Sequence, residues 1–443
     1  MDIGIVGAGI AGLSAAYDLL NEGHTVTVYE ANAHAGGLAA GFRDPAWDWH
    51  MEHFYHHLFQ TDDSMIKLVG ELGIDDKLFF RRPITSTYYQ GKIYPFDSAL
   101  RILQFPPFNL IRYARFGLVT ILLRYIFRDW QKLEQTTADE WMRRWYGDVV
   151  YETSWRPLLI NKFGPYFQEV NMAWMWARMV ARSFSLGYFE GGFQTLVDAL
   201  VGAVEGRGGQ LRLKTPVTGL SSLEDGRLSL ESGAGQAVHD RVLATTSPQL
   251  LARLAPALSG DYLGKLLDLK SMGAVVMVFA LDRQFFQDGT YWLNVPASSA
   301  DKLQNTFPFL ALVEHTNFVD NVHYNGDHLL YCGDYVPPEH PYLEMSQEDL
   351  SQRFTSHFAA FNSEFGPDWI RQEWLFRTRY AQPVPLVNHS QHIPAIQTPL
   401  PNLYFASMSQ VYPWDRGTNF AVEIGRRAAA IMLGRDVPPA SWE

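Results

Sequence analysis

The amino-terminal stretch MDIGIVGAGIAGLSAAYDLLNEGHTVTVYEANAHAGGL (residues 1–38) decides the fold of this chain. Residues 1–6 form a short apolar run without a helical period, which predicts a buried strand. The turn GAGIAG (residues 7–12) then opens an amphipathic helix that ends at Gly23, and residues 25–29 form a β-branched second strand. These elements predict a complete β-α-β unit of about 30 residues.

The three glycines of the turn predict a site for a dinucleotide. Gly7 permits a tight turn out of the strand, Gly9 lets the backbone approach a pyrophosphate, and Gly12 allows close packing of helix and strand. The amino end of the helix directs free N–H groups and a positive dipole at the phosphates. Glu30, at the end of the second strand, is placed to accept hydrogen bonds from an adenosine ribose, and an acid there argues against NADP.

A second glycine pair, Gly36-Gly37, follows Glu30 after five residues. This spacing resembles the signature of the flavin-dependent amine oxidase superfamily, which includes monoamine oxidases, phytoene desaturases and protoporphyrinogen oxidases. The resemblance implies that the pair wraps the pyrophosphate of FAD. Many members carry Arg after the pair, whereas this chain has Leu38, as some desaturase-like members do.

Composition sets the broad class of the protein. The 443 residues are 47% hydrophobic and include 13 Trp, which is typical of a large core with aromatic-lined pockets. A net charge of −11 without a basic run argues against nucleic acid as a partner. Cys332 is the single cysteine, so an internal disulfide and a cysteine-built metal site are excluded and a cytoplasmic location is expected. We expect neither a signal peptide nor a membrane span, because the chain enters its first strand directly and lacks 18 consecutive apolar residues.

Residues 47–57 are dense in aromatic and histidine side chains. The resemblance places a loop beneath the flavin ring at this distance from the glycine pair. It aligns Glu52 with the family's acid and brings residues 54–57 to the ring, although Phe54 replaces the usual glycine. His56 and His57 are therefore candidate catalytic groups, because histidine titrates near neutrality and moves protons.

Two other interpretations of this loop stay open. His50, His53, His56 and His57 have spacings that place pairs of imidazoles on one helical face, as a metal site requires. No matching acid or cysteine pattern accompanies them, so we predict no metal. The remaining interpretation is that the aromatic and histidine side chains pack a buried loop.

An inserted helical region follows. We expect a helix over residues 63–72, a hairpin over 85–94, and mostly helical structure over 100–127 and 141–182. Residues 103–127 are very apolar and carry arginines at their edges, which is typical of a helix lying in a membrane interface. The alternative is a buried domain helix with solvated arginines. The resemblance favours membrane contact, since family members acting on carotenoids or porphyrinogens sit on bilayers through this region.

The middle of the chain returns to strands. A helix over residues 196–203 is followed by an expected strand over 210–217, in which the resemblance places the backbone of Val217 against the adenine. A hairpin turning at 224–226 and a strand over 240–248 come next. Further expected elements are strands over 271–286, 306–315, 328–335 and 371–380 and a helix over 346–361.

The strand over 271–286 contains a position at which subclasses of the family differ. Amine oxidases carry a lysine in this strand that holds water at flavin N5. Counting from Gly273 places that lysine at Met277, which disfavours amine oxidation and favours desaturase-like chemistry.

The carboxyl-terminal stretch resembles the family's final motif. A strand over residues 401–406 is followed by Gly417, which opens a helix running to residue 431. The resemblance directs the amino end of this helix at the N1–C2=O edge of the flavin, where its dipole stabilises negative charge. Arg416 precedes the glycine and is a candidate for binding an anionic flavin or substrate, or for a structural ion pair with Asp415.

The sequence therefore predicts an α/β fold: a Rossmann-like FAD-binding domain of the GR2 type, interleaved with an α+β substrate domain. The FAD-binding domain is assigned to residues 1–80, 187–250 and 395–443. The substrate domain is assigned a helical part over 81–186 and a mixed sheet over 251–394.

The predicted function is FAD-dependent removal of a hydride from a large apolar or amphipathic small molecule. The alternatives are a flavin-dependent isomerase resembling UDP-galactopyranose mutase and a non-catalytic FAD-binding protein. For the mutase, the residues considered for gripping a diphosphate are Arg156, Arg377, Arg379, Arg416, Tyr380 and Tyr412. No oligomeric state is predicted. The predicted FAD-binding residues are Gly7, Ala8, Gly9, Ile10, Ala11, Gly12, Glu30, Ala31, Gly36, Gly37, Leu38, Phe54, Tyr55, His56, Val217, Gly417, Asn419, Phe420 and Ala421.

Overall fold

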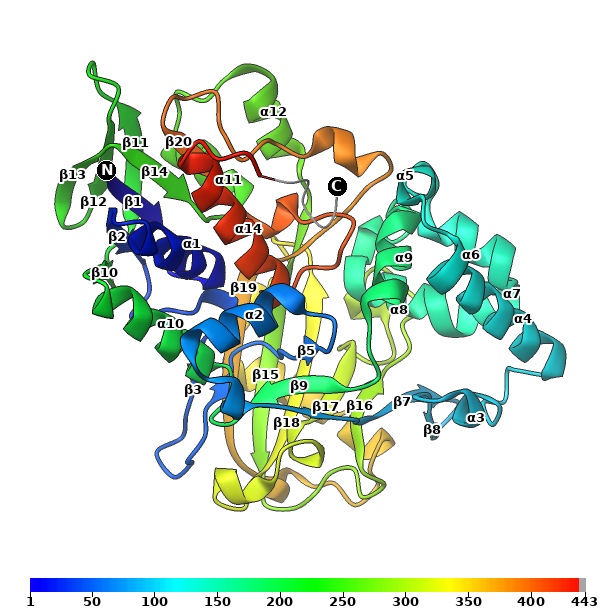
Figure 1. The fold of residues 1–443 in the computed structure, drawn as a ribbon. Helices are drawn as coiled ribbons and strands as arrows, with labels where there is room; N and C mark the ends of the chain where they lie inside the picture. Colours follow the sequence, from blue (N-terminus) through cyan, green and yellow to red (C-terminus); the bar gives the residue numbers. More distant parts are fainter. Residues whose placement is uncertain (438–443) are drawn as a thin grey trace.

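A parallel five-stranded sheet forms around the amino-terminal β-α-β unit in the computed structural model, which describes residues 1–437 (Figure 1). Its central strand β1 (Asp2–Val6) pairs with β2 (Thr25–Tyr29) on one side and β14 (Arg241–Ala244) on the other. The outer strands are β10 (Gln210–Arg212) and β20 (Leu403–Phe405), which gives the order β10-β2-β1-β14-β20. One sheet thus collects strands from three distant parts of the chain, as the predicted α/β fold requires.

Four helices pack around this sheet and each other: α1 (Ile10–Asn21), α2 (Asp63–Leu72), α10 (Gln194–Gly206) and α14 (Thr418–Met432). The crossing of α1 with α14 is close because Gly425 has no side chain. A Cβ there would lie 2.2 Å from the carbonyl oxygen of Ala11.

A mixed seven-stranded sheet forms the second layer, in the order β19-β15-β18-β17-β16-β7-β8. The strand β15 (Ser271–Leu281) is flanked by antiparallel partners on both sides. At the other end, β7 is parallel to β16, so the hairpin of the inserted region extends this sheet. The other strands are β7 (Ile84–Tyr89), β8 (Lys92–Pro95), β16 (Thr290–Asn294), β17 (Ala311–Glu314), β18 (His328–Val336) and β19 (Ile370–Pro383).

A helical lobe lies beside the two sheets, at the right of Figure 1. Its core is aromatic, with Trp141, Trp174 and Trp176 among the buried side chains. The helices of the lobe are α3 (Ala99–Ile102), α4 (Leu110–Ile121), α5 (Trp130–Leu133), α6 (Ala138–Tyr146), α7 (Asp148–Val150), α8 (Arg156–Phe163) and α9 (Met172–Ala181).

Smaller elements complete the described chain. Short sheets join distant segments, and one of them, β5-β9-β6, links the loop after β4 to the segment that precedes α10. The remaining strands are β3 (Gly41–Phe42), β4 (Met51–Glu52), β5 (Leu58–Phe59), β6 (Leu78–Arg81), β9 (Leu186–Phe189), β11 (Val217–Ser222), β12 (Leu228–Ser232) and β13 (Gly235–His239). The remaining helices are α11 (Pro248–Leu254), α12 (Gly260–Asp268) and α13 (Gln347–Thr355).

Some predicted boundaries are wrong. The expected strand over 210–217 ends at Arg212, because the chain turns through Lys214, which has a positive φ of 51°, before Val217 begins β11. The strand expected over 306–315 is confined to β17, and that over 271–286 ends at Leu281. The proposed domain boundaries remain predictions, and residues 438–443 of the last one lie outside the described residues.

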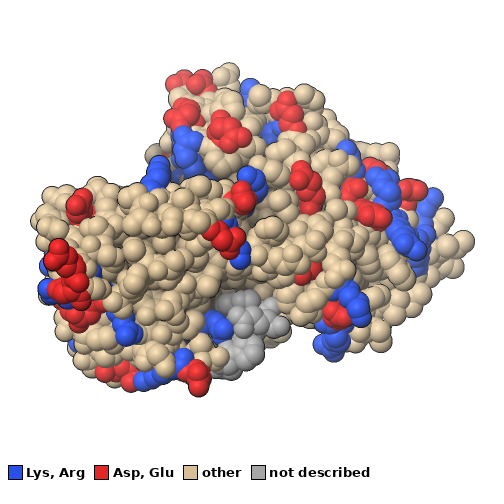
Figure 2. All heavy atoms as spheres, turned by 90° about the horizontal axis from the view of Figure 1, so that it is seen from above, with Lys and Arg blue, Asp and Glu red and all other residues tan. Residues whose placement is uncertain are grey.

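Surface charge, helix length and clusters of metal-binding side chains bear on three kinds of partner: nucleic acid, a membrane and a metal ion. Figure 2 shows acidic and basic side chains interspersed over one face, without a continuous basic field among the described residues drawn there. No helix in residues 1–437 is long and apolar enough to cross a bilayer. The same residues hold no group of three or more His, Cys, Asp or Glu arranged to bind a metal ion.

Candidate functional site

A cavity of about 2080 Å³ runs between the five-stranded sheet, the seven-stranded sheet and the helical lobe. Its wall begins at the glycine turn before α1 and reaches the side chains of α4. Pockets for one small ligand are typically about 300–1,000 Å³. The cavity therefore has room for a dinucleotide and a second large molecule together.

Two glycine turns meet at one end of the cavity. Gly9 and Gly36 form a parallel bridge, and the N–H of Gly36 donates to the carbonyl of Ala8 at 2.8 Å. A Cβ on Gly9 would have its nearest neighbour, Gly37 Cα, at 4.0 Å, so the space over Gly9 is open to the cavity. The first amides of α1 face this space without intrahelical acceptors, which makes the turn a cradle for a pyrophosphate.

Gly12 serves packing instead. A Cβ at this position would lie 2.1 Å from the carbonyl oxygen of Gly7, so only glycine lets α1 approach the end of β1. Gly7 itself has a φ of 108°, which side chains rarely adopt. Gly7 and Gly9 line the cavity, whereas Gly12 lies beneath the turn.

Glu30 is held in place at the edge of the cavity. Its Oε2 accepts the N–H of Ala8 at 2.9 Å, and its Oε1 accepts the backbone and side-chain N–H groups of Asn32 at 2.8 Å each. The remaining lone pairs face the cavity wall to which Glu30 contributes. This geometry fits the predicted hydrogen bonds to a ribose.

Most of the predicted FAD-binding residues line the same cavity. The exceptions are Ala8 and Gly12, which lie beneath the turn, Ala31, which is exposed to solvent, and Val217, which packs beside β14. The predicted residues that line the cavity are Gly7, Gly9, Ile10, Ala11, Glu30, Gly36, Gly37, Leu38, Phe54, Tyr55, His56, Gly417, Asn419, Phe420 and Ala421.

Sequence reasoning missed Thr245, Thr246 and Ser247, which line the cavity after β14. The sequence contained a signal for these three residues: they follow a strand of the parallel sheet, and ligands of such sheets bind at the carboxyl ends of the strands. The hydroxyl of Thr245 donates to the carbonyl of Val6 at 3.0 Å and so joins two strand ends.

The amino end of α14 closes the glycine end of the site. Gly417 is its extended N-cap, and Asn419 in its first turn accepts the N–H of Met65 at 3.0 Å. This bond attaches α14 to α2 and orients the positive end of the α14 dipole towards the cavity wall that Gly417 forms.

The loop between β4 and β5 brings His53 to His57 to the cavity. Burial lowers the pKa of His56 to about 4, and it lowers the pKa of His57 well below its usual value, with a contribution from Arg182. The Nδ1 atom of His56 contacts the carbonyl of Phe54 at 2.5 Å, whereas the Nδ1 of His57 has no partner among the described residues. Both imidazoles are neutral at pH 7, which weakens their predicted role in moving protons.

Glu52 anchors this loop from behind and does not line the cavity. Its carboxylate accepts the hydroxyl of Tyr188 at 2.9 Å and the N–H of Phe193 at 2.8 Å. The hydroxyl of Tyr331 donates to the carbonyl of Glu52 at 2.8 Å. Burial raises the pKa of this carboxyl to about 7, against which these hydrogen bonds act.

Four cations line the cavity where the helical lobe meets the loop before α14. This inner cationic cluster consists of Lys162, Arg178, Arg182 and Arg416. Asp415 accepts Lys162 at 2.7 Å and Arg178 at 3.1 Å. Burial raises the pKa of Asp415, but Lys162 and Arg178 outweigh it and hold that pKa well below its usual range.

The hydrogen-bond partners of Arg416 lie on β18 and β19 rather than at its neighbour Asp415. Its guanidinium donates to the carbonyl of Ala381 and to the hydroxyl of Tyr335, and it lies 5.2 Å over the Tyr335 ring. The ion pairs of Asp415 thus run to α8 and α9, and Arg416 stays at the cavity wall.

The six residues considered for binding a diphosphate do not all line the cavity. Arg156, Arg377, Tyr380 and Arg416 line the cavity, but Arg379 and Tyr412 do not. Arg379 is exposed and pairs with Glu344, and Tyr412 donates to Glu134 at 3.0 Å.

The position assigned to the family's lysine is corrected by the structure. Met277 is fully buried and packs in the core on the far side of the seven-stranded sheet. Side chains alternate along β15, so the cavity-facing residues are Ala274 and Val276. None of these positions is a lysine, so the expectation that this strand lacks one holds for the cavity-facing side as well.

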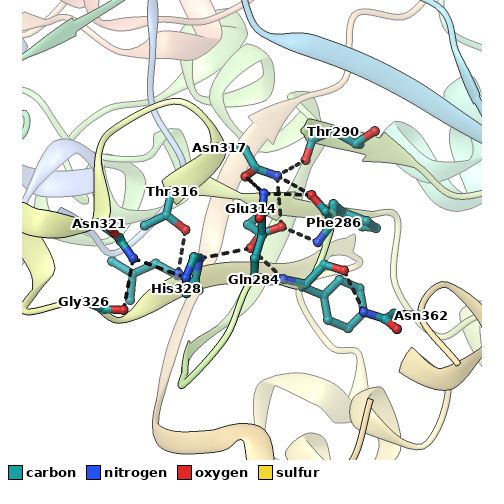
Figure 3. Close-up of polar contacts among 12 residues, drawn as sticks. Gln284, Phe286, Thr290, Glu314, Thr316, Asn317, Asn321, Gly326, His328 and Asn362 are labelled. Carbon is teal, nitrogen blue, oxygen red and sulfur yellow. Dashed lines mark hydrogen bonds and ion pairs between the residues drawn. The ribbon is translucent and has the colours of Figure 1, made fainter. Parts of the chain in front are cut away.

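A buried polar network supports β16, which carries the cavity residues Tyr291, Trp292 and Asn294 (Figure 3). At its centre, Glu314 accepts the N–H groups of Phe285 and Phe286 at 2.8 Å and 2.5 Å. Asn317 donates to Glu314 and to the carbonyl of Thr290. The network joins the end of β17 to the loop before β16.

Comparison with known proteins gives the following similarities. The family model for flavin-containing amine oxidoreductases matches residues 10–433. The 15-cis-phytoene desaturase of Synechococcus elongatus is 42% identical over 78 residues, which are 18% of this chain and 16% of that protein. The aligned part thus spans about a sixth of the length of that relative.

Solved structures agree in fold along the chain. A candidate protoporphyrinogen oxidase from Exiguobacterium sp. 255-15 has a TM-score of 0.76 at 20% identity, covering 98% of this chain and 99% of that chain. A reduced UDP-galactopyranose mutase has a TM-score of 0.75 at 14% identity, covering 98% of this chain and 95% of that chain. At these levels of identity, the two similarities show a shared fold.

Proposed function

The chain belongs to the flavin-containing amine oxidoreductase family, and we propose that it is an FAD-dependent oxidoreductase acting on a large apolar or amphipathic substrate. The observation that carries the proposal is the continuity of the cavity. It joins two glycine turns suited to a dinucleotide with an apolar wall from the helical lobe.

The residues present fit FAD. The glycine turns and the amino end of α1 would hold the pyrophosphate, Glu30 would hold a ribose, and Gly417 at the start of α14 would lie at the flavin end. A bound flavin supplies hydride acceptance from a substrate carbon. The chain supplies position, exclusion of water by the packed lobe, and positive charge from Arg416.

The wall beyond the flavin end favours an apolar substrate body. Phe116, Trp155 and Met179 line it, and the cavity-facing side of β15 offers Ala274 and Val276. Without a lysine on that side of β15, the strand lacks the water-holding group of amine oxidases. This supports desaturase-like or dehydrogenase-like chemistry over amine oxidation.

Peripheral membrane contact is part of this proposal. The side chains of Leu110 and Ile111 on α4 are 78% and 79% exposed. Leu118 and Ile121 are also exposed, yet they line the cavity, so the apolar surface within residues 103–127 adjoins the cavity wall. An apolar substrate in a bilayer would reach the cavity through this surface. A cytoplasmic location is proposed with it, since a single cysteine suits a reducing compartment.

Vesicle sedimentation tests the membrane contact. We expect the protein to pellet with phosphatidylglycerol–phosphatidylcholine vesicles and the variant L110E/I111E to stay in the supernatant. The control V322E, at an exposed apolar residue outside the helical lobe, should pellet like the wild type. Equal sedimentation of both variants would contradict the contact.

Anaerobic reduction tests the reaction. The FAD-loaded protein is mixed with isoprenoids, porphyrinogens, amines and sugar nucleotides, and loss of flavin absorbance is followed. We expect bleaching by an apolar or amphipathic compound and none by simple amines. Bleaching by amines alone would contradict the proposal.

An isomerase is the second candidate, favoured by the fold shared with UDP-galactopyranose mutase and by the cations in the cavity. Conversion of UDP-galactopyranose to the furanose form by the reduced protein, seen by chromatography, would support it. A protein that binds FAD but is reduced by no member of the panel would instead support the non-catalytic alternative.

A further inference from the structure

The inner cationic cluster holds more positive charge than its surroundings balance. Lys162, Arg178, Arg182 and Arg416 face a single carboxylate, Asp415. Burial lowers the pKa of Lys162 well below its usual value, so only the three guanidinium groups are counted here, and they leave two positive charges in excess. The nearby imidazoles of His56 and His57 are neutral at pH 7, and Tyr335 contributes a hydroxyl that accepts from Arg416.

Arg182 is the cation of the cluster that lacks a protein partner. Its guanidinium makes no hydrogen bond or ion pair with any residue that the structure describes, and it lies 5.7 Å over the ring of Phe59. The residue is exposed to solvent through the cavity, while the protein around this opening and the nearby Arg178 lower its pKa to about 9.

Ligand binding makes this excess costly unless the ligand is acidic. A substrate that fills the cavity displaces the water that solvates the cations, and a desolvated charge without a partner is strongly unfavourable. The phosphates of FAD have their own site at the glycine turns, and negative charge on a reduced flavin offsets one cation at most. At least one positive charge therefore remains for the substrate.

Apolar surface continues from the cluster. Met179 of α9 and Phe116 of α4 line the cavity beyond it, and the buried Trp174 ring supports Lys162 and Arg178 from behind the wall, at 5.2 Å and 5.6 Å. The ligand that matches this wall has an acidic head and an apolar body.

We propose that the cavity takes an amphipathic substrate whose carboxylate or phosphate group is bound by the inner cationic cluster, with Arg182 as its free partner, and whose apolar body extends towards α4. This inference rests on the proposed function, because it concerns the substrate of the same site.

Calorimetric titration of the FAD-loaded protein with three C12 probes tests the inference: dodecanoate, dodecyl phosphate and dodecanol. We expect at least one acid to bind ten-fold or more tightly than dodecanol. The stronger of the two acids then identifies carboxylate or phosphate as the natural head group. Equal affinities for all three probes would overturn the inference, and this comparison needs no variant.

Variants locate the interaction. We expect R182Q to reduce acid affinity about ten-fold and to leave dodecanol binding unchanged, because the guanidinium makes no bond that folding needs. The matched control is R82Q, in which a cavity arginine that donates to the carbonyl of Asp97 is removed, and it should bind both probe types as the wild type does. Unchanged acid binding by R182Q would overturn the role of Arg182. Failure of the proposed function is distinguishable, since it is read from the flavin, which no apolar or amphipathic compound would bleach, whereas the affinities of the three probes are measured without flavin reduction.

Discussion

Gly9 and Gly12 belong to one turn but are glycine for different physical reasons. The space over Gly9 is open to the cavity, whereas a Cβ at Gly12 would collide with the carbonyl of Gly7 at 2.1 Å. The first glycine serves the ligand and the second serves the fold. The sequence pattern predicted both roles, because each glycine has a set place in such a turn.

Substitution separates these two roles. We expect Gly9→Val to abolish FAD binding and to keep the wild-type melting temperature of the apoprotein. Gly12→Val should lower the melting temperature itself, because helix and strand must move apart. Flavin absorbance after purification and circular dichroism on heating provide the two measurements.

A matched control lies in α10. Gly202 has no atom within 4 Å of its would-be Cβ, so Gly202→Ala should keep FAD and stabilise the helix by about 0.5–1 kcal/mol. A fully yellow Gly9→Val protein would contradict the pyrophosphate site.

Glu30 gives the second test at this scale. Glu30→Ala should weaken FAD binding by about 1–3 kcal/mol, roughly ten- to a hundred-fold in the dissociation constant, through loss of charged hydrogen bonds. Glu30→Gln should also weaken FAD binding, since its amide places an N–H donor against the backbone N–H of Ala8 or Asn32. Fluorescence titration of the apoprotein with FAD measures both, and an unchanged constant for Glu30→Ala would argue against the ribose contact.

The roles of individual histidines were harder to predict than those of glycines. The sequence places His56 and His57 in the cavity correctly, but their proton-transfer role depended on an ordinary pKa. Burial holds both imidazoles neutral, and burial of a loop cannot be read from the loop itself.

At the scale of elements, two buried carboxylates hold loops to strands, and they differ in how they are hydrogen-bonded. Among the described residues, Glu52 accepts the Phe193 amide on Oε1, and its Oε2 accepts the hydroxyl of Tyr188 and no backbone N–H. Glu314 accepts backbone N–H groups on both oxygens (Figure 3). An amide side chain has one acceptor and one donor end, so it fits the first site but not the second.

This contrast predicts opposite outcomes for one kind of substitution. Glu314→Gln should destabilise the fold by about 1–3 kcal/mol, because an N–H donor then faces a backbone N–H. Glu52→Gln should cost much less at neutral pH, since the Gln oxygen still accepts from Phe193 and its NH₂ can donate to the Tyr188 hydroxyl. Urea unfolding measures both, and equal losses would contradict the contrast.

The Glu52 carboxyl also gives a pH dependence with a definite sign. Its pKa is about 7 in the folded state, against a reference of 4.5. The folded state therefore holds this proton more tightly, and its contribution to stability is full below about pH 4.5 and is lost as pH rises through about 7. The loss amounts to about 2–4 kcal/mol.

Glu52→Gln removes this titration. We expect its melting temperature, relative to wild type, to rise between pH 5 and pH 8, measured by differential scanning calorimetry at constant ionic strength. A difference that stays constant or falls with pH would contradict the raised pKa.

Elements with a strong period were predicted well and short ones were not. The sequence predicted α2 at its observed bounds and α14 to within one residue, because apolar residues recur regularly between clear start and stop signals. It missed β16 and β9, of five and four residues, whose pairing comes from distant strands. At Met277 the strand was right but the face was wrong, since a shift of one residue exchanges the two sides of a strand.

At the scale of the whole molecule, the site is assembled from segments that are far apart in sequence. Asp415 meets Lys162 and Arg178 across separations of 253 and 237 residues. The hydrophobic periodicity of a segment contains no information about its contacts with distant segments, so the inner cationic cluster could not be predicted from the sequence. The convergence of both chain ends on the cavity was predictable, because each end carries a motif of its own.

That convergence makes a prediction about FAD. If the cofactor contacts the glycine turns and the start of α14 together, it links residues 7–12, 36–38 and 417–421 in one bound state. Ligand bound only to the folded state stabilises it, by about 2.7 kcal/mol at a hundred-fold excess over the dissociation constant. FAD should therefore raise the melting temperature of the whole chain and slow amide hydrogen exchange in all three segments.

Hydrogen exchange followed by mass spectrometry, with and without FAD, measures this directly. The helix α13 provides an internal control, since none of its residues lines the cavity and its exchange should not change. Gly9→Val should show no FAD-dependent protection at residues 417–421, although these lie some 400 residues away in sequence. Protection confined to residues 7–38 in the wild type would mean that α14 does not contact the cofactor, and the role given to Gly417 and Arg416 would then be wrong.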